Sequence, residues 1–355
     1  MKILEVNTEK TWRGGERQTY YNIKGFKEAG QQVELLSLKG YPLEQKSREL
    51  NIPIHCVNND FEAIKWIAKY GSNYDIIHVQ TAKALTYAVV TKPFHQKPVV
   101  YTRRVDFVPK GKLTLIKYKL ADRVVVITTP IKEILENFGL SDVELITEIV
   151  ERKELNRERA HTFLKEHNLE NKKIIATTSA LVPHKDPITM VKAVNELSKI
   201  RDDFVFLHFG DGELRKEVEN AIKEMKLEDF YYLMGFYDNV EDFFLIFDLF
   251  VMSSKEEGLG SSVLDAFIYK VPVVSTDAGG LKESVGDRGL LCPVGDYKCL
   301  AESMNRVLSD ENLRNELVKK GFERAITYHS LEKVTEEYLK LFNELILKKG
   351  GSPSQ

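Results

Sequence analysis

Short apolar runs alternate with stretches of helical spacing along the whole chain. Runs rich in Val, Ile, Leu and Phe are typical of buried strands, and apolar residues three or four positions apart are typical of helices that pack on a core. Strands that alternate with helices form βαβ units and a mainly parallel sheet. The sequence therefore predicts an α/β fold, and two successive sets of such units predict two doubly wound domains.

The predicted elements are placed by these two periodicities. The predicted strands are Ile3–Val6, Val33–Leu38, Ile54–Val57, Ile76–Val79, Val99–Tyr101, Val124–Ile127, Val143–Ile146, Ile174–Thr178, Phe204–Phe209, Tyr231–Met234, Leu249–Met252, Val273–Ser275 and Leu290–Leu291. The predicted helices include Gln18–Ala29, Phe61–Tyr70, Pro130–Phe138, Arg157–His167, Pro187–Ile200, Glu213–Met225 and Leu331–Leu347.

The alternation breaks at a charged stretch, Glu151-Arg152-Lys153-Glu154. We therefore predict one domain over residues 1–152 and a second over residues 153–330. The amphipathic helix that follows, at 331–349, belongs to no βα unit. The small and polar residues of 350–355 predict a flexible tail.

Composition narrows the class of protein. At 355 residues the chain is long for a single core, which agrees with two domains. A formal net charge of −2 argues against nucleic acid as a partner, because binding to phosphate backbones needs a basic surface. No run approaches the roughly 18 apolar residues of a membrane span, and the first strand shows no signal-peptide stretch. We expect a cytoplasmic protein.

The three cysteines are Cys56, Cys292 and Cys299. The spacing of Cys292 and Cys299 does not fit a zinc knuckle, and we expect no metal site. Since disulfides are rare in the cytosol, we expect all three cysteines to be reduced structural thiols.

The most informative stretch runs from Ser253 to Ala266, where a predicted strand turns into a helix. It contains Glu257, the turn Gly258-Leu259-Gly260 and Asp265. Glycines let a ligand approach the backbone, and the first N–H groups of a helix attract anions such as phosphate. Glu257 offers oxygens to hydroxyl groups, and the Asp265 side chain leans back toward the same helix end. This pattern suits a nucleotide-sugar; the alternative is an ordinary turn with a solvated acid.

Polar clusters also follow the predicted strands of the first half. Gly14 and Gly15 follow the first strand, His78 lies in the fourth, and Arg104 follows the fifth. Ligands of open α/β sheets bind beyond the carboxyl ends of the strands, so these residues are candidates for a binding site. The alternatives are a plain turn at the glycine pair and a hydrogen-bonded strand-end histidine.

The second half shows the same arrangement. Lys185 follows its first strand, and Gly210 begins a Gly-Asp-Gly turn after its second strand. Lys185 is a candidate ligand for phosphate, with a solvated loop lysine as the alternative. The Gly210 turn alone is a common turn sequence.

The spacing of Glu257 and Asp265 resembles the Glu-x7-Glu motif of retaining glycosyltransferases of family 4, or group 1, which have the GT-B fold. The run from Pro272 to Glu283 is similar to the next signature of that family. The resemblance implies two Rossmann-like domains facing a central cleft, the first binding the acceptor and the second the nucleotide-sugar. It also implies that the terminal helix packs back on the first domain.

The resemblance implies roles for single residues. Glu257 would contact the donor sugar, Asp265 the ribose and Lys185 the donor diphosphate. The glycine pair at 14–15 resembles the family's N-terminal glycine loop, and the turn at Gly210 would lie near the nucleotide base.

The chain departs from the family pattern at three positions. Asp265 is one methylene shorter than the family's Glu, and Ala180 stands where the family carries a diphosphate-binding Arg. Arg104 stands near a family His that faces the acceptor or the reacting sugar. Since arginine stays protonated, Arg104 would bind an anionic group or support charge rather than act as a base. The candidate replacements for the missing Arg are Arg13, Arg103, Arg104 and His184.

The mechanism that the resemblance implies is a retaining, metal-independent transfer. The leaving diphosphate would help to deprotonate the acceptor, with no cofactor besides the nucleotide-diphosphate sugar. Lys185 and the turn 258–260 would hold the phosphates while Glu257 orients the sugar. The alternatives are a nucleotide-sugar epimerase and a catalytically degenerate GT-B protein that binds a nucleotide-sugar or a partner.

The acceptor expected from the family is a saccharide or a lipid-linked molecule in bacterial lipopolysaccharide or surface polysaccharide synthesis. The segment Val105–Leu120 mixes apolar and basic residues. This composition suits peripheral contact with the inner face of an anionic membrane. A loop and helix packed on their own domain is the alternative.

Overall fold

The computed structural model describes residues 1–350, so the tail predicted at 350–355 lies, beyond Gly350, outside the described residues. The chain divides into two compact units. The first contains residues 1–149 and the chain from Tyr328 on, and the second contains residues 150–327. The boundary that the sequence predicts lies at 152/153, and the terminal helix that it predicts spans 331–349.

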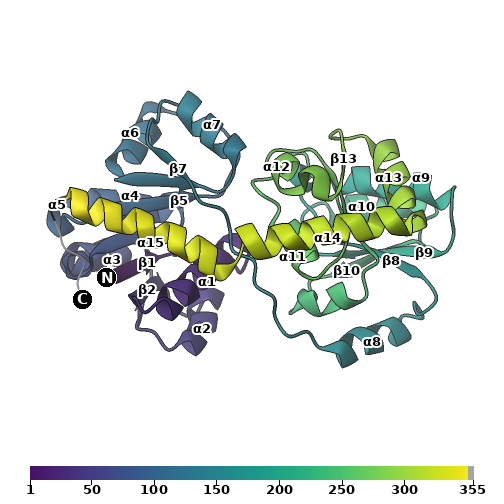
Figure 1. Ribbon diagram of the computed structural model, residues 1–355, viewed down its shortest axis with the longest axis horizontal. Coiled ribbons are helices and arrows are strands. Elements are labelled where there is room, and N and C mark those ends of the chain that lie inside the picture. Colours follow the sequence, from purple (N-terminus) through teal and green to yellow (C-terminus); the bar gives the residue numbers. More distant parts are fainter. Residues whose placement is uncertain (351–355) are drawn as a thin grey trace. The chain divides into compact units, whose positions relative to one another are not determined.

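Within residues 1–350, the first unit holds a parallel sheet of seven strands in the order β3-β2-β1-β4-β5-β6-β7. Figure 1 labels β1, β2, β5 and β7 of this sheet. The strands are β1 (Lys2–Val6), β2 (Gln32–Leu38), β3 (Ile54–Val57), β4 (Ile76–Val79), β5 (Val99–Arg103), β6 (Arg123–Val126) and β7 (Val143–Leu145). The α-helices are α1 (Gly14–Glu28), α2 (Pro42–Ser47), α3 (Asp60–Tyr70), α4 (Ala82–Val90), α5 (Lys92–His95), α6 (Lys112–Leu120), α7 (Thr129–Asn137) and α15 (Leu331–Lys348). Short 3₁₀ turns are η1 (Arg48–Leu50) and η2 (Gly71–Asn73).

The described part of the second unit holds a sheet of six strands in the order β10-β9-β8-β11-β12-β13, again with parallel pairing. The strands are β8 (Lys173–Thr178), β9 (Phe204–Phe209), β10 (Tyr231–Gly235), β11 (Leu249–Met252), β12 (Val273–Thr276) and β13 (Leu290–Cys292). The α-helices are α8 (Arg157–Glu166), α9 (Pro187–Ser198), α10 (Arg215–Glu224), α11 (Ser261–Ile268), α12 (Leu281–Val285), α13 (Tyr297–Ser309) and α14 (Glu311–Tyr328). The 3₁₀ turns are η3 (Pro183–Lys185), η4 (Val240–Leu245) and η5 (Gly286–Arg288).

The predicted α/β fold with two parallel sheets is confirmed. Each predicted strand is present, and its ends shift by at most two residues. The physical reason is burial of both faces: neighbours such as Ile3 and Leu4 in β1 are both fully buried. A parallel sheet covered by helices on both faces produces continuous apolar runs, and these are the signal that the sequence carries.

Helix α15 completes the core of the first unit. Its Phe342 packs against Phe26 of α1, with ring centroids 5.5 Å apart. A Cβ atom at Gly25 of α1 would lie 2.0 Å from Thr335 Oγ1, so only glycine allows the two helices to approach this closely. The last helix is therefore an integral part of the first unit.

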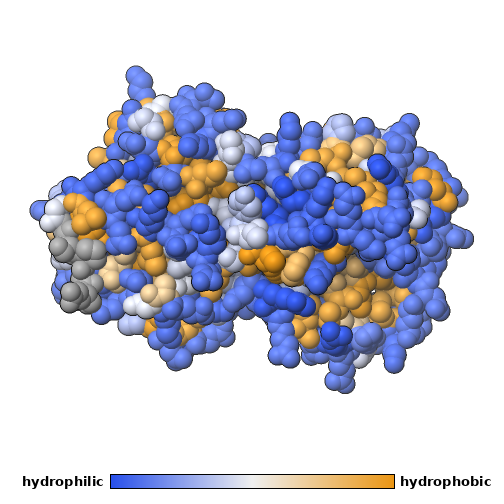
Figure 2. Space-filling view, in the orientation of Figure 1, coloured by the Kyte–Doolittle hydropathy of each residue, from blue (hydrophilic) through white to orange (hydrophobic). Residues whose placement is uncertain are grey.

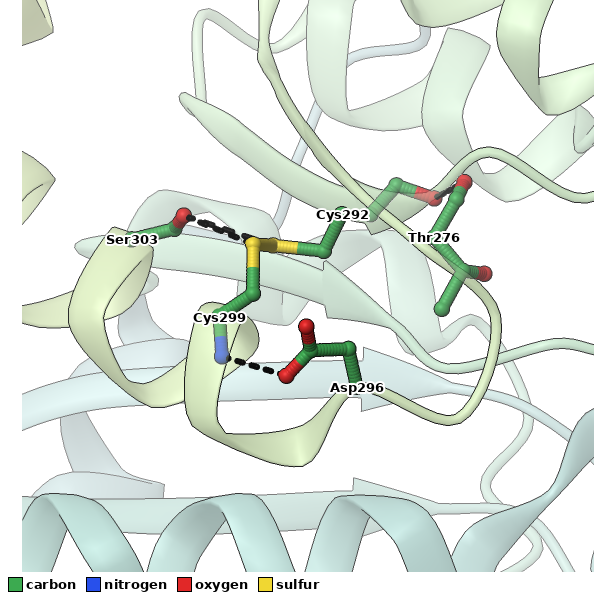
Figure 3. The surroundings of a disulfide bond; sticks show 6 residues. Thr276, Cys292, Asp296, Cys299 and Ser303 are labelled. Carbon is green, nitrogen blue, oxygen red and sulfur yellow. Dashed lines mark hydrogen bonds between the residues drawn. A yellow bond between two sulfur atoms is a disulfide. The ribbon is translucent and has the colours of Figure 1, made fainter.

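The prediction of three reduced thiols is wrong for two of them. Cys292 and Cys299 form a disulfide (Figure 3). Cys292 ends β13 and Cys299 lies in the first turn of α13, where Asp296 Oδ1 accepts a hydrogen bond from the Cys299 N–H at 3.0 Å. This turn brings the two Cα atoms to 5.7 Å, a normal distance for a disulfide. The spacing of the two cysteines in the sequence does not by itself indicate this bridge.

Among the helices of residues 1–350, none combines the length and the apolar character that a membrane span requires.

Candidate active site

Four loops meet at the carboxyl edge of the second sheet, where ligands of open α/β sheets bind. They are the β8–α9 loop (179–186), the β9–α10 loop (210–214), the β11–α11 loop (253–260) and the β12–α12 loop (277–280). Backbone hydrogen bonds connect them: Lys255 N–H donates to the His184 carbonyl at 2.8 Å, and Gly280 N–H donates to the Glu257 carbonyl at 2.8 Å. The loops therefore form one continuous edge.

Lys185 and Glu257 form an ion pair at this edge, through Lys185 Nζ and Glu257 Oε2. Their side chains are only 20% and 15% exposed. The Ser253 hydroxyl donates to the backbone carbonyls of Lys185 and Asp186 at 3.1 and 2.9 Å, which ties the two loops together. Two residues that are 72 positions apart in sequence thus share one partly buried place, and both were named as candidates from the sequence.

The turn Gly258-Leu259-Gly260 leads from Glu257 into α11. Gly260 is the N-cap residue of α11 with φ +83°, a backbone conformation that favours glycine. A Cβ atom there would also lie 2.5 Å from Leu281 Cδ2. The Ser284 hydroxyl donates to the Leu259 carbonyl at 2.8 Å and fixes the turn. Among the described residues, no side chain caps the first turn of α11, since its N-cap residue is a glycine.

Asp265 lies in α11, beyond its first turn, and is buried. The structure therefore does not present it as a solvated acid.

Gly210 is explained by the packing of two loops. It has φ +142°, and a Cβ atom there would lie 2.0 Å from the Ser179 carbonyl oxygen. Only glycine lets the β9–α10 loop lie against the β8–α9 loop. Its contact with a nucleotide base stays a prediction.

Ala180 lies half-buried in the β8–α9 loop. Of its expected replacements, His184 lies beside Lys185 in η3 with an exposed side chain. Arg103 makes other contacts: its guanidinium is buried in the first unit and donates to the Tyr118 hydroxyl at 2.7 Å.

The remaining candidates belong to the first unit. Gly14 and Gly15 open α1, whose Glu16 carboxylate accepts a hydrogen bond from the Arg13 N–H at 2.8 Å. A Cβ atom at Gly15 would meet no atom within 4 Å, so packing does not explain this glycine. Arg104 follows β5 as expected, and its Nε lies 3.2 Å from Glu148 Oε1.

His78 is a structural residue. It is fully buried in β4, with Nδ1 2.6 Å from Glu5 Oε1 and Nε2 2.8 Å from Thr102 Oγ1. The Thr102 hydroxyl lies 2.9 Å from the Tyr338 hydroxyl of α15. Of the two readings offered by the sequence, the hydrogen-bonded histidine is the one observed. These contacts were not predicted from the sequence. The feature that could have indicated them is an acidic residue, Glu5, inside the apolar strand β1.

Comparison with known families covers both units. Residues 160–324 match the family described as glycosyl transferases group 1, and residues 12–151 match glycosyltransferase family 4. Over 170 residues the chain is 29% identical to the lipopolysaccharide core biosynthesis glycosyltransferase LpsE of Rhizobium meliloti, covering 47% of this chain and 49% of that protein. The match to a Campylobacter jejuni enzyme, "GalNAc-alpha-(1->4)-GalNAc-alpha-(1->3)-diNAcBac-PP-undecaprenol alpha-1,4-N-acetyl-D-galactosaminyltransferase", is 27% identical over 227 residues and covers 62% of each. The aligned regions thus span about half to three fifths of these relatives.

Solved structures share the whole fold. The structure of Anabaena HepE in complex with UDP and glucose superimposes with a TM-score of 0.86 at 17% identity, covering 97% of this chain and 100% of that one. A glycosyltransferase from Rickettsia africae also has a TM-score of 0.86, at 21% identity, covering 98% of each chain. At these identities the likeness establishes the fold, and the two family matches together span most of the sequence. The chain belongs to the group 1 (family 4) glycosyltransferases and has their GT-B fold.

Proposed function

We propose that the protein transfers a sugar from a nucleotide-diphosphate sugar to an acceptor hydroxyl, with retention of the anomeric configuration and without a metal ion. The observation that carries the proposal is the pairing of Lys185 with Glu257 beside the first turn of α11. A lysine and a helix N-terminus both attract a diphosphate, and a carboxylate accepts hydrogen bonds from sugar hydroxyls.

The ion pair suggests how the site would receive its donor. A diphosphate carries more negative charge than one carboxylate, and the first-turn N–H groups of α11 would add to its attraction. Lys185 would then exchange Glu257 for the diphosphate. The Glu257 oxygens would become acceptors for the sugar hydroxyls.

The proposed reaction forms a bond between the acceptor oxygen and the anomeric carbon as the bond from that carbon to the diphosphate breaks. The acceptor proton passes to an oxygen of the leaving diphosphate on the same face of the sugar. Lys185 and the turn 258–260 would lower the barrier by stabilising the charge that develops on the leaving group. Asp265 would act on the ribose and Gly210 near the base.

We assign acceptor binding to the first unit, with Gly14, Gly15 and Arg104 as the candidate contacts. Arg104 is paired with Glu148. Because arginine stays protonated, we assign Arg104 a role in binding or positioning an anionic group rather than in proton transfer.

The relatives support a bacterial surface-polysaccharide pathway on the cytoplasmic side. One is named for lipopolysaccharide core biosynthesis, and another has PP-undecaprenol in its name, which supports a saccharide or lipid-linked acceptor and a peripheral membrane contact. A similar fold was solved with UDP and glucose, so UDP-sugars are the first donors to test.

Release of nucleoside diphosphate from UDP-, GDP- and ADP-sugars, followed by proton NMR of the product, tests the proposal. We expect turnover of one donor class, a product with the donor's anomeric configuration, and activity that survives EDTA. Inversion, or loss of activity in EDTA, would contradict retention or metal independence. An epimerised nucleotide-sugar would favour the epimerase, and binding without turnover the degenerate protein.

A further inference from the structure

The disulfide between Cys292 and Cys299 lies at the carboxyl edge of the second sheet. Cys292 is the last residue of β13, and β13 pairs in parallel with β12, whose own carboxyl end leads into the loop 277–280. We call the loops 179–186, 210–214, 253–260 and 277–280 the donor edge, after the proposed function. The bridge therefore lies at the same edge of the sheet as the candidate active site.

Backbone hydrogen bonds connect the bridge to the loop that carries Glu257. The Asp277 N–H donates to the Cys292 carbonyl at 2.9 Å. Three residues further on, the Gly280 N–H donates to the Glu257 carbonyl at 2.8 Å. The position of the end of β13 thus affects the position of Glu257 through one short loop.

A second connection runs through α13 to the loop that carries Lys185. Cys299 lies in the first turn of α13, and α13 packs on α9. Met304 of α13 and Met190 of α9 belong to the same buried core. Helix α9 begins after its N-cap residue Asp186, which directly follows Lys185. The bridge therefore joins the strand that is connected to Glu257 to the helix that packs behind Lys185.

The two sulfur atoms differ in access, and one hydroxyl lies beside both. Cys292 is 1% exposed, whereas Cys299 is only half-buried. The Ser303 hydroxyl lies 3.4 Å from Cys292 Sγ and 4.0 Å from Cys299 Sγ (Figure 3). Since the sulfur atoms of a disulfide carry no proton, the hydroxyl is the donor. The same hydroxyl can donate to a thiolate that forms when the bridge opens.

The loop between the two cysteines leaves the bridge within reach of solvent. Residues 293–296 are all exposed, among them Val294 at 44%. In Figure 2, the surface where α12 and α13 lie, in the upper right of the view, carries both hydrophobic and hydrophilic residues. A dithiol can therefore reach Cys299 without unfolding of the second unit.

We propose that Cys292 and Cys299 form a redox site, which a dithiol reduces and whose reduction weakens binding of the sugar donor. One thiolate of the dithiol attacks Cys299 Sγ and forms a mixed disulfide, while Cys292 Sγ leaves as a thiolate and takes up a proton. The second thiol of the dithiol then attacks the dithiol's own sulfur in the mixed disulfide and releases Cys299 as a thiol. The dithiol ends as a disulfide, and the protein gains two electrons and two protons.

The expected consequence is a looser donor edge in the reduced protein. Reduction removes the covalent connection between β13 and α13, so the loop 277–280 loses part of the support that fixes Glu257. A less ordered site binds its ligand more weakly, because more order is lost on binding. On the cytoplasmic side, where the proposed function would place the protein, disulfides are rare, and those present are usually catalytic or redox-sensing. The effect on donor binding rests on the proposed function, whereas the redox site does not.

Hydrogen–deuterium exchange of the oxidised and the reduced full chain tests the proposal without a nucleotide. The reductant is millimolar dithiothreitol without denaturant, and alkylation with mass spectrometry reports the state of the cysteines. We expect complete reduction, and exchange at least about threefold faster in peptides from 253–260 and 277–285. Peptides from β9, which is separated from β12 and β13 in the sheet, should change less.

Three results of this experiment would overturn the proposal. The first is a bridge that dithiothreitol reduces only in denaturant. The second is equal exchange at the donor edge in both states. The third is an equal rise in β9 and at the donor edge, which would report a general loss of stability.

Two sets of substitutions serve as controls. Cys292→Ser with Cys299→Ser should exchange like the reduced wild type, with or without dithiothreitol. Cys56→Ser removes the free cysteine and should keep the response of the wild type. A response that is lost in Cys56→Ser, or kept in Cys292→Ser with Cys299→Ser, would overturn the proposal.

Calorimetric titration with UDP, GDP and ADP in both redox states separates this proposal from the proposed function. We expect the nucleotide that binds to bind at least about threefold more weakly to the reduced protein. Equal affinity in both states would overturn the effect on donor binding. No nucleotide binding in either state would contradict the proposed function, and the exchange experiment would still decide for or against the redox site.

Discussion

Lys185 and Glu257 are the residues on which the proposed chemistry depends. We expect Lys185→Ala and Glu257→Ala each to lower kcat/KM for the nucleotide-sugar at least tenfold, or about 1.4 kcal/mol of transition-state stabilisation. Lys185→Ala removes the positive charge that would stabilise the leaving diphosphate. Glu257→Ala removes the hydrogen-bond acceptor for the sugar hydroxyls. Steady-state kinetics with saturating acceptor measures both.

The control for these variants is an ion pair of the same type on the surface of the same unit. Lys199 Nζ lies 2.7 Å from Glu196 Oε1, and the lysine is well exposed. Lys199→Ala should leave kcat/KM unchanged. Wild-type kinetics in Lys185→Ala or Glu257→Ala would remove that residue from the site.

His208 makes the stability of the second unit depend on pH. It is buried in β9, between the Tyr231 hydroxyl at 2.7 Å and the Ser179 carbonyl at 2.9 Å, and burial lowers its pKa to about 4. The unfolded chain therefore binds this proton at a higher pH, near 6.5, than the folded chain does. Stability is full above pH 6.5 and is lost as the pH falls toward 4.

Urea unfolding at pH 7 and pH 5 measures this effect. From pH 7 to pH 5, we expect the free energy of unfolding of His208→Gln to fall by about 2 kcal/mol less than that of the wild type. The difference between the two proteins cancels the other titrating groups. Equal pH dependence in both would show that His208 is accessible to protons in the folded chain.

At the scale of elements, buried hydrogen bonds join the first sheet to α15. The side chains of Glu5 in β1, His78 in β4, Thr102 in β5 and Tyr338 in α15 form a continuous chain of contacts. Burial raises the pKa of Tyr338 to about 12, so its hydroxyl stays protonated. These contacts hold a helix from the end of the sequence on strands from its beginning.

Removing one side chain from these buried contacts should lower the free energy of unfolding more than removing a side chain at the surface does. We expect His78→Ala to lower the free energy of unfolding by about 3 kcal/mol, because the buried Glu5 keeps its hydrogen bond from Gln80 but loses its contact with His78. The comparison is His55→Ala, which removes a partly exposed histidine 2.7 Å from Glu34 and should cost less than about 1 kcal/mol. Denaturant unfolding gives both values, and similar costs would refute the account of the buried contacts.

The disulfide joins the end of β13 to the start of α13. We expect one reactive thiol, Cys56, in the native protein and three after reduction. Reduction should lower stability by about 2 kcal/mol, because a short loop is no longer closed in the unfolded chain. Alkylation with mass spectrometry counts the thiols. Three reactive thiols before reduction would agree with the cytosolic expectation and contradict the bridge.

At the scale of the whole molecule, the fold was predictable because its signal is repeated in every strand. Runs such as Phe204–Phe209 are buried at every position, and burial on both faces is typical of a parallel sheet that helices cover. The motif at 257–265 was readable for a similar reason, since a strand, a turn and a helix lie in one continuous stretch.

Individual side-chain contacts between distant segments were not predictable. Nothing in the sequence near Lys185 specifies Glu257 as its partner, and the pairing arises from the order in which β8 and β11 lie side by side. The disulfide was not predicted because it depends on the path of the backbone between β13 and α13. The burial of His78 depends on α15, which follows it by more than two hundred residues.

The measurement that tests the central claim most directly is calorimetric titration with UDP, GDP, ADP and CMP, followed by their sugar conjugates. We predict that one nucleoside diphosphate binds, that its sugar conjugate binds more tightly, and that Lys185→Ala weakens both at least tenfold. No binding of any nucleotide, or equal affinity in Lys185→Ala, would contradict the donor site.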